Sequence, residues 1–206
     1  IYADDTQLYI SVNMEMKDAT KEIIETCLHE IRLWMLRNYL KINTNKTKMI
    51  LLKSKRSTAN LTFTVLYDDS SVDNSEVAKT LGVPLDAKLN MVRFIQEKCR
   101  SSYYHLRNLG RIKRSLDVSM RIKLIHNMVL SKLDYCNSIL ALVPKCHLTK
   151  LQKVQNAAVC LIYDVPKRSS TSKYLKQAHF LPIEERIAFK LCSILFNVIS
   201  GNSPLY

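Results

Sequence analysis

Residues 91–109 read MVRFIQEKCRSSYYHLRNL, and at this stretch the chain changes character. Its apolar residues recur at helical spacing and form one stripe: Ile95, Cys99, Tyr103 and Leu106. This pattern predicts an amphipathic helix that buries the stripe. Gly110 follows directly and is expected to end the helix in a left-handed conformation. After this helix the pattern is helical throughout, whereas the sequence before it mixes helix and strand.

The charge of the chain is concentrated in the same half. Its 206 residues include 31 Lys and Arg against 18 Asp and Glu, a net charge of +13. Residues 1–90 contain 12 basic and 12 acidic side chains, whereas residues 91–206 contain 19 basic and 6 acidic ones. Such an asymmetry favours a polyanionic partner, nucleic acid above all, over an ordinary solvated surface.

Basic residues in and after residues 91–109 are the candidate contacts to a nucleic-acid backbone. Three of them recur every seven residues and so share one helix face, opposite the apolar stripe. The full set is Arg93, Arg100, Arg107, Arg111, Lys113 and Arg114. Tyr103 and Tyr104 are suited to stacking on bases, although burial of Tyr103 in the stripe is the expected alternative.

The first half predicts a short sheet and one long helix. Residues 6–12 (TQLYISV) alternate between apolar and polar, which is typical of a half-buried strand. Residues 18–40 predict an amphipathic helix with the apolar stripe Ile23, Ile24, Cys27, Leu28, Ile31, Trp34 and Met35. The remaining predictions are strands at 49–52 and 61–66, a polar turn at 67–76, and a strand at 77–85 that ends at Gly82 and Pro84.

The second half predicts three further helices. Ser115 is the expected N-cap of the first, with Asp117 in its first turn. That helix is expected to bury Ile122, Ile125, Val129 and Leu133. Residues 147–163 predict the next helix, buried along Leu148, Leu151, Val154, Ala158 and Leu161. Pro182 begins the last one, which runs to Gly201.

Composition excludes several classes of protein. The three glycines lie far apart, which rules out the clustered-glycine loops of P-loop, dinucleotide-binding and kinase folds. The six cysteines form no C-x-x-C and fit no common zinc spacing, so we expect reduced thiols in an intracellular protein. No apolar run is long enough to cross a bilayer, so no membrane partner is expected.

Four residues at the start carry the candidate catalytic chemistry. Tyr2-Ala3-Asp4-Asp5 precedes the alternating stretch and suits the tip of a hairpin. Adjacent carboxylates supply the oxygen ligands that Mg²⁺ or Mn²⁺ takes. Two such ions about 4 Å apart clamp the attacking and leaving oxygens of a phosphoryl transfer. An Asp-Asp turn is also a common structural feature, so both interpretations stay open on these residues.

The segment YADDTQLY at 2–9 resembles the catalytic motif of reverse transcriptases of non-LTR retrotransposons, the long interspersed elements of animal genomes. Jockey-like and related clades are the most similar. Further segments resemble the family in the same order along the chain. They are Trp34, Asn38, Leu40, Asn43, Lys46 and Thr47 (W-x-x-x-N-x-L…N-x-x-K-T), 81–86 (LGVPLD), 107–109 (RNL), 133–138 (LDYCNS), 151–158 (LQKVQNAA), and 179–183 (HFLPI) with Arg186 and Ile187.

This resemblance implies an RNA-directed DNA polymerase, in which the 3′ hydroxyl of a DNA primer attacks a deoxynucleoside triphosphate on an RNA template. It implies that Asp4 is the main ligand of Mg²⁺ or Mn²⁺, with Asp5 as its partner. It also places Lys46 near the triphosphate as a charge stabiliser or proton donor, and Tyr2 and Ala3 near the primer end and nucleotide. The residues alone are equally consistent with a purely structural interpretation, in which Lys46 is an exposed loop lysine and Tyr2 is a packed strand residue.

The predicted fold is therefore α+β. Residues 1–89 are expected to form the C-terminal part of a polymerase palm, a short antiparallel sheet with a long helix and exposed apolar surface. Residues 90–206 are expected to form an all-α, basic, thumb-like region. The fingers and the first palm carboxylate of the family would precede Ile1, so we expect no polymerase activity from this chain alone. The resemblance also implies a nuclear site of action.

A non-catalytic helical nucleic-acid-binding protein is the alternative, with a helix-turn-helix module as its commonest form. In that case the Asp-Asp turn is accidental, and Asp4 and Asp5 can be replaced without consequence. This alternative leaves the resemblance of residues 34–47 unexplained. The sequence leaves the oligomeric state open.

Overall fold

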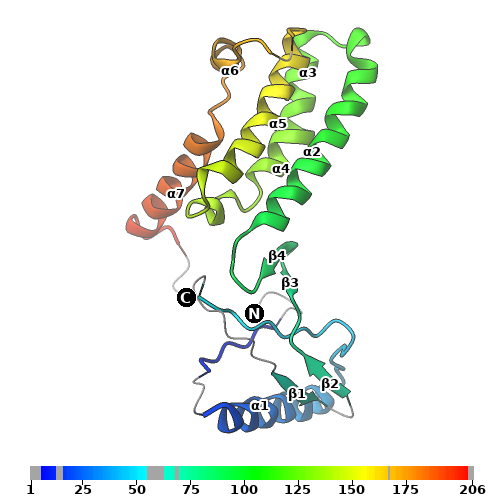
Figure 1. Ribbon diagram of the computed structural model, residues 1–206, viewed down its shortest axis with the longest axis vertical. Helices are drawn as coiled ribbons and strands as arrows, with labels where there is room; N and C mark the ends of the chain where they lie inside the picture. The colour runs from blue at the N-terminus through cyan, green and yellow to red at the C-terminus, as the bar shows by residue number, and fades with distance from the viewer. Residues whose placement is uncertain (1–5, 13–15, 55–62, 68–69, 167, 204–206) are drawn as a thin grey trace. The chain divides into compact units, whose positions relative to one another are not determined.

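The computed structural model describes residues 6–12, 16–54, 63–67, 70–166 and 168–203 (Figure 1). Its elements confirm the predicted α+β class. In chain order they are α1 (Lys17–Arg37), β1 (Thr64–Tyr67), β2 (Ser70–Asp73), β3 (Val77–Thr80), β4 (Val83–Asp86), α2 (Val92–Ile112), η2 (Lys113–Ser115), α3 (Val118–Ile125), η3 (His126–Leu130), α4 (Ser131–Asp134), η4 (Asn137–Leu140), α5 (Lys145–Tyr163), α6 (Ser172–Gln177) and α7 (Ile183–Ile199).

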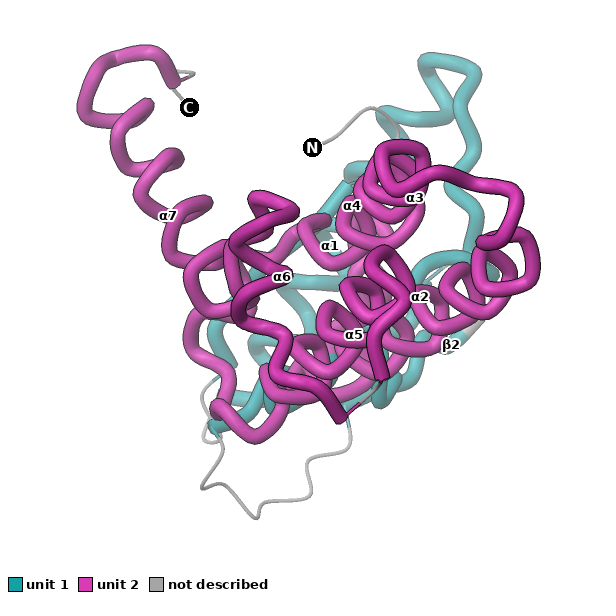
Figure 2. Tube along the Cα trace, turned by 90° about the horizontal axis from the view of Figure 1, so that it is seen from above, with its two compact units in different colours: residues 1–78, 86–88 teal, residues 79–85, 89–206 magenta. Residues whose placement is uncertain are grey.

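Two compact units make up the chain (Figure 2). Unit 1 comprises residues 1–78 and 86–88, and unit 2 comprises residues 79–85 and 89–206. Unit 1 holds α1 and the β1–β2 sheet, while all the later helices belong to unit 2. The assignment of residues 1–89 to a palm and 90–206 to a thumb stays a prediction.

The long helix of unit 1 forms where the apolar periodicity predicted it. α1 packs on β1, and Glu25 Oε1 accepts a hydrogen bond of 2.8 Å from the backbone N–H of Leu66. The predicted burial of the apolar stripe is only partly correct, because Ile23 and Trp34 are 59% and 57% exposed. The other members of the stripe are half-buried: Ile24, Cys27, Leu28, Ile31 and Met35.

Strand predictions in unit 1 need correction. Residues 6–12 form no strand, and Leu8 and Ile10 are largely exposed. Alternation does not suffice because a strand needs partners for its N–H and C=O groups, and in the described part of the chain residues 6–12 have none. Of the predicted strand at 49–52, only a one-residue bridge from Met49 to Asn74 forms.

The sheet of unit 1 has one strand, β1, where residues 61–66 predicted a strand, and one strand, β2, from residues that the sequence assigned to a turn. β1 pairs antiparallel with β2, from Thr64 opposite Asp73 to Tyr67 opposite Ser70. β2 lies inside the polar stretch 67–76, so the prediction of a turn over this whole stretch is wrong. Its partner β1 buries Val65 and Tyr67, and this burial supplies the apolar face that β2 itself lacks.

The predicted single strand at 77–85 is a hairpin. β3 and β4 form a second two-stranded sheet, joined by Leu81 and Gly82. Both loop residues have positive φ, +47° and +79°, as the two-residue turns that match the twist of a hairpin require. Pro84 therefore lies within β4 rather than at the end of a strand.

Unit 2 begins with the helix that residues 91–109 predict, but this helix is longer. α2 runs through Gly110, which lacks a positive φ, so the predicted C-cap is wrong. Gly110 faces α5 instead, where a Cβ would lie 3.8 Å from Leu161 Cδ1. The N-cap of α3 is Asp117, whose Oδ1 accepts from the Met120 N–H at 2.6 Å, and not Ser115.

One core fills unit 2. Most of the predicted buried faces of the α3–η3–α4 segment and of α5 are confirmed, since Ile125, Val129, Leu133, Leu151 and Val154 are at most 2% exposed. Ile122 and Leu161, also predicted as buried, are half-buried. η3 is π-helical and continues α3 into α4. α7 begins after Pro182 as predicted, whereas the periodicity did not reveal the short α6.

All six cysteines are free thiols, of which Cys160 is buried and Cys146 and Cys192 are exposed. Within the ranges that the structure describes, no helix has the length and apolar character needed to cross a bilayer.

Candidate nucleic-acid interface

One stripe of α2 faces solvent and carries three of the six predicted backbone contacts. Arg100, Arg107 and Arg111 share this stripe because they are spaced by seven and four residues, and all three are exposed. The opposite side of α2 packs along α5, with Ile95 and Leu106 only 1% and 6% exposed. The buried side thus fixes the direction in which the arginines project. We call Arg100, Arg107 and Arg111 the arginine face.

The arginine face differs from Arg93 in its electrostatics. Arg93 Nε lies 3.5 Å from Glu97 Oε1, and Lys79 Nζ lies 3.9 Å from the other oxygen of the same carboxylate. By contrast, no carboxylate among the described residues pairs with the arginine face. Three guanidinium groups there offer their donors to solvent and are available to phosphate oxygens.

Lys113, also predicted as a backbone contact, is engaged within the fold. Its Nζ pairs with Asp164 Oδ1, and Arg121 Nη1 lies 3.7 Å from the other carboxylate oxygen. Arg121 also donates to the carbonyl oxygens of Lys113 at 3.1 Å and Ile162 at 3.0 Å. The hydrogen bond from Lys113 lowers the pKa of Asp164 below its ordinary value. Lys113 therefore ties the end of α2 to the end of α5, while Arg114 is exposed.

Two tyrosines extend the arginine face. Tyr104 lies between Arg100 and Arg107 on the same stripe and is 60% exposed, with its ring edge-on to His105 at 5.4 Å. Tyr103 is 42% exposed, so its predicted burial is wrong. Its position on the helix lies at the border between the buried and the solvent-facing sides of α2.

The predicted catalytic and metal residues are mostly outside the described ranges. Tyr2, Ala3, Asp4 and Asp5 all lie in residues 1–5. Lys46 is exposed in a turn, where its N–H donates to the Asn43 carbonyl at 3.1 Å. Across the described residues, no three His, Cys, Asp or Glu side chains gather as a metal site.

Several residues that carry the family resemblance have local structural roles. Asn38 Nδ2 donates to the Trp34 carbonyl at 2.8 Å and so holds the last turn of α1. Thr47 Oγ1 donates to the Asn43 carbonyl at 3.1 Å and closes the turn that bears Lys46. The W-x-x-x-N and N-x-x-K-T spacings therefore correspond to two backbone-fixing contacts.

In unit 2, segments 133–138 and 179–187 are joined by a charge-assisted pair. Arg186 Nε donates to Asp134 Oδ1 at 2.7 Å, and Arg186 Nη2 pairs with the second carboxylate oxygen. Arg186 is mostly buried, at 15% side-chain exposure. A two-pronged pair of this kind fixes orientation as well as distance, so it anchors α7 to α4.

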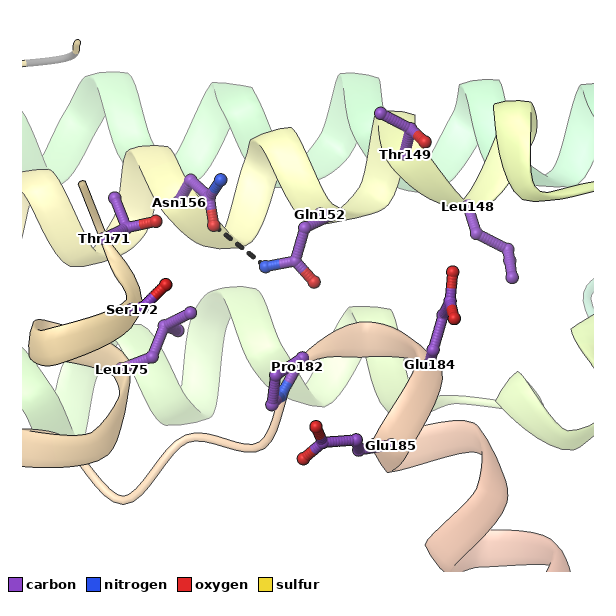
Figure 3. Close-up of a pocket in the computed structure, with 10 residues that line it drawn as sticks. All are labelled: Leu148, Thr149, Gln152, Asn156, Thr171, Ser172, Leu175, Pro182, Glu184 and Glu185. Atoms are coloured by element: carbon purple, nitrogen blue, oxygen red, sulfur yellow. Dashed lines mark hydrogen bonds between the residues drawn. The ribbon is translucent and has the colours of Figure 1, made fainter. Parts of the chain in front are cut away.

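Residues 151–158 anchor the same part of α7 through amides (Figure 3). Gln152 Oε1 accepts from the Ile183 N–H at 2.9 Å, and its Nε2 donates to Asn156 Oδ1 at 2.8 Å. Gln155 is fully buried and donates to the Leu181 carbonyl at 2.8 Å. Two of these amides, Gln152 and Asn156, line a pocket of about 420 Å³ between α5, α6 and α7. The amide side chains hydrogen-bond to one another and to the backbone of residues 181–183. The pocket therefore lies where these amides anchor the start of α7.

Lys98 is a buried cation that the sequence analysis missed. It is 6% exposed, donates to the Lys132 carbonyl and, at 2.6 Å, to the Tyr135 carbonyl, and lies 4.5 Å from the centre of the Phe94 ring. Burial lowers its pKa from 10.5 to about 8. Its burial could have been predicted from its place four residues after Phe94, on the buried side of α2. It satisfies backbone carbonyl groups at the end of α4.

Comparison of the chain with protein-family models, curated protein sequences and solved structures gives no match.

Proposed function

We propose that this chain belongs to the polymerase core of an RNA-directed DNA polymerase of the non-LTR retrotransposon type, and that unit 2 grips the RNA template–DNA primer duplex by its phosphates. The observation that supports this most is the arginine face of α2, three exposed guanidiniums in one stripe without carboxylate partners in the described residues. The motif order along the chain supports the polymerase assignment.

Phosphate recognition suits this surface physically. Cations spaced along a straight helix neutralise phosphates and release condensed counterions, which gives affinity that is independent of sequence and falls with salt. A polymerase must bind every sequence it copies, so backbone contacts that fix register without reading bases are the required kind. A hybrid duplex has an A-like shape, which proteins recognise mainly by form.

Nucleotide transfer is assigned to the first half. Adjacent carboxylates at Asp4 and Asp5 have the oxygen chemistry that Mg²⁺ or Mn²⁺ takes. Such ions stabilise charge on the attacking and leaving oxygens of the transfer. Lys46 is exposed and so is free to approach the triphosphate of an incoming nucleotide.

A salt titration of hybrid binding tests the duplex contact. The variant R100Q/R107Q/R111Q should weaken binding at low salt by at least tenfold and reduce the slope of log affinity against log salt by about 2–3. The matched control K173Q/K176Q/K190Q removes the same charge from exposed lysines of α6 and α7 and should change the slope little. Equal effects of the two variants, or no hybrid binding by the unaltered chain, would contradict the proposal.

A non-catalytic nucleic-acid-binding protein is the second candidate function. It is favoured by the core of unit 2, since every described residue of that core belongs to unit 2. Paramagnetic broadening by Mn²⁺ in NMR spectra separates the two candidates. If the polymerase assignment is right, Mn²⁺ should broaden the resonances around residues 2–9. The double variant Asp4→Asn with Asp5→Asn should remove this broadening. The matched double variant Asp68→Asn with Asp69→Asn should retain it. Broadening that persists after Asp4 and Asp5 are replaced favours the non-catalytic nucleic-acid-binding protein.

A further inference from the structure

The two exposed tyrosines of α2 add aromatic rings to the arginine face, a feature that contact with duplex phosphates does not need. Phosphates require cations and hydrogen-bond donors, which the arginine face supplies. Tyr103 and Tyr104 instead expose aromatic rings to water, at 42% and 60% exposure. Aromatic rings interleaved with arginines are the features with which proteins bind unpaired nucleotides, because an unpaired base has a free face on which a ring can stack.

Helix geometry brings the two kinds of side chain together. Arg100 precedes Tyr103 and Tyr104 by three and four residues, and Arg107 follows them by four and three. Residues three and four apart are neighbours on a helix surface, so each tyrosine has Arg100 as its neighbour on one side and Arg107 on the other. His105 meets the Tyr104 ring edge-on at 5.4 Å, which restrains the ring while leaving its exposed side open.

We propose that Tyr103 and Tyr104, between Arg100 and Arg107, form a stacking site for unpaired nucleotides that extend from a template–primer duplex. The site rests on the proposed function, because the arginine face holds the adjacent duplex phosphates. It selects a junction of duplex and single strand over a blunt duplex. Every base has a face to stack, so the selection is independent of sequence.

Three ligands test this site with the full chain: a blunt RNA–DNA hybrid, the same hybrid with a short single-stranded RNA extension, and the same extension without bases. The extension should improve affinity about tenfold, whereas the abasic extension should give only the small gain of its added phosphates. Y103L/Y104L should lose the tenfold preference and keep its affinity for the blunt hybrid. Y103F/Y104F, which keeps both rings, should retain the preference.

The outcomes separate this site from the proposed function. Equal binding of the base-bearing and abasic extensions would overturn the stacking site. So would a preference for the base-bearing extension that survives in Y103L/Y104L. Neither result would contradict the proposed binding of duplex phosphates by the arginine face. Loss of blunt-hybrid affinity in Y103L/Y104L, with helix content unchanged by circular dichroism, also overturns the stacking site. Failure of the unaltered chain to bind the blunt hybrid contradicts the proposed function instead.

Discussion

Unit 2 buries its apolar side chains in one continuous core, whereas unit 1 leaves many of its own in water. In unit 2, the helices α2 to α7 contribute side chains with almost no exposure, such as Ile125 and Leu151. In unit 1, the described buried apolar residues are Phe63, Val65 and Tyr67, while Ile23 and Trp34 on α1 are more than half exposed. The comparison shows that a helix pattern alone does not guarantee burial, because burial needs a partner surface.

Truncation of one apolar side chain in each unit gives the largest expected contrast. Leu151→Ala should lower the free energy of unfolding of unit 2 by about 3 kcal/mol, since it leaves a cavity in a packed core. Ile23→Ala should change that of unit 1 by less than about 0.5 kcal/mol, because the side chain is already in water. Hydrogen exchange with mass spectrometry, which resolves the two units by peptide, measures both. Comparable losses would show that a surface covers Ile23 in solution.

Lys98 provides a pH-dependent test of the unit 2 core. Burial lowers its pKa from 10.5 to about 8, so between these values the unfolded chain binds a proton that the folded chain has released. The free energy of unfolding of the wild type should therefore rise relative to that of Lys98→Met by about 2–3 kcal/mol between pH 8 and pH 10. Denaturation by urea at several pH values, followed by circular dichroism, checks this. A difference that does not change with pH would mean that the amine is hydrated in solution.

The end of α1 offers the smallest of these effects, and it concerns unit 1. Tyr39 has φ +57° and follows the C-cap; its N–H donates to the Leu36 carbonyl at 3.2 Å and the Leu40 N–H to the Met35 carbonyl at 2.8 Å. This is the bonding pattern in which glycine is preferred at the Tyr39 position. Tyr39→Gly should stabilise unit 1 by about 1 kcal/mol, since the tyrosine is 99% exposed and loses no contact.

Trp34, the single tryptophan, reports on unit 1 by fluorescence during denaturation. Tyr39→Ala serves as the matched control, because it removes the ring but keeps a Cβ in the left-handed conformation. It should give little or no gain. An equal gain from both variants would indicate that loss of the exposed ring, and not relief of backbone strain, stabilises the helix.

The sequence was most informative where periodicity is long. α1, α2, α5 and α7 all form within a few residues of their predicted bounds, because many apolar positions must agree for a long helix. Short elements were less predictable. β2 has a polar sequence and is a strand only through its pairing with β1, and residues 6–12 alternate without forming one.

For the candidate site, the sequence predicted which side of α2 bears the arginines. It did not predict which of the basic residues pair with a carboxylate in the fold. The seven-residue spacing places Arg93, Arg100 and Arg107 together, yet Arg93 faces Glu97. Lys113 reads as one more surface cation, although Asp164, 51 residues away in sequence, pairs with it. Ion pairs between distant segments carry no local signal, so only the fold distinguishes engaged from available cations.

By itself, the sequence determined where the helices form and that the positive charge lies after residue 90, because helical period and composition are local properties of the chain. The tertiary structure decided which of those residues meet water. Packing of α2 against α4 and α5 buries one side of this helix, where Lys98 donates to carbonyls at the end of α4, and leaves Tyr103, Tyr104 and the arginine face exposed. The physical reason is that exposure and pairing depend on which surfaces meet, and surfaces far apart in sequence meet only in the folded chain.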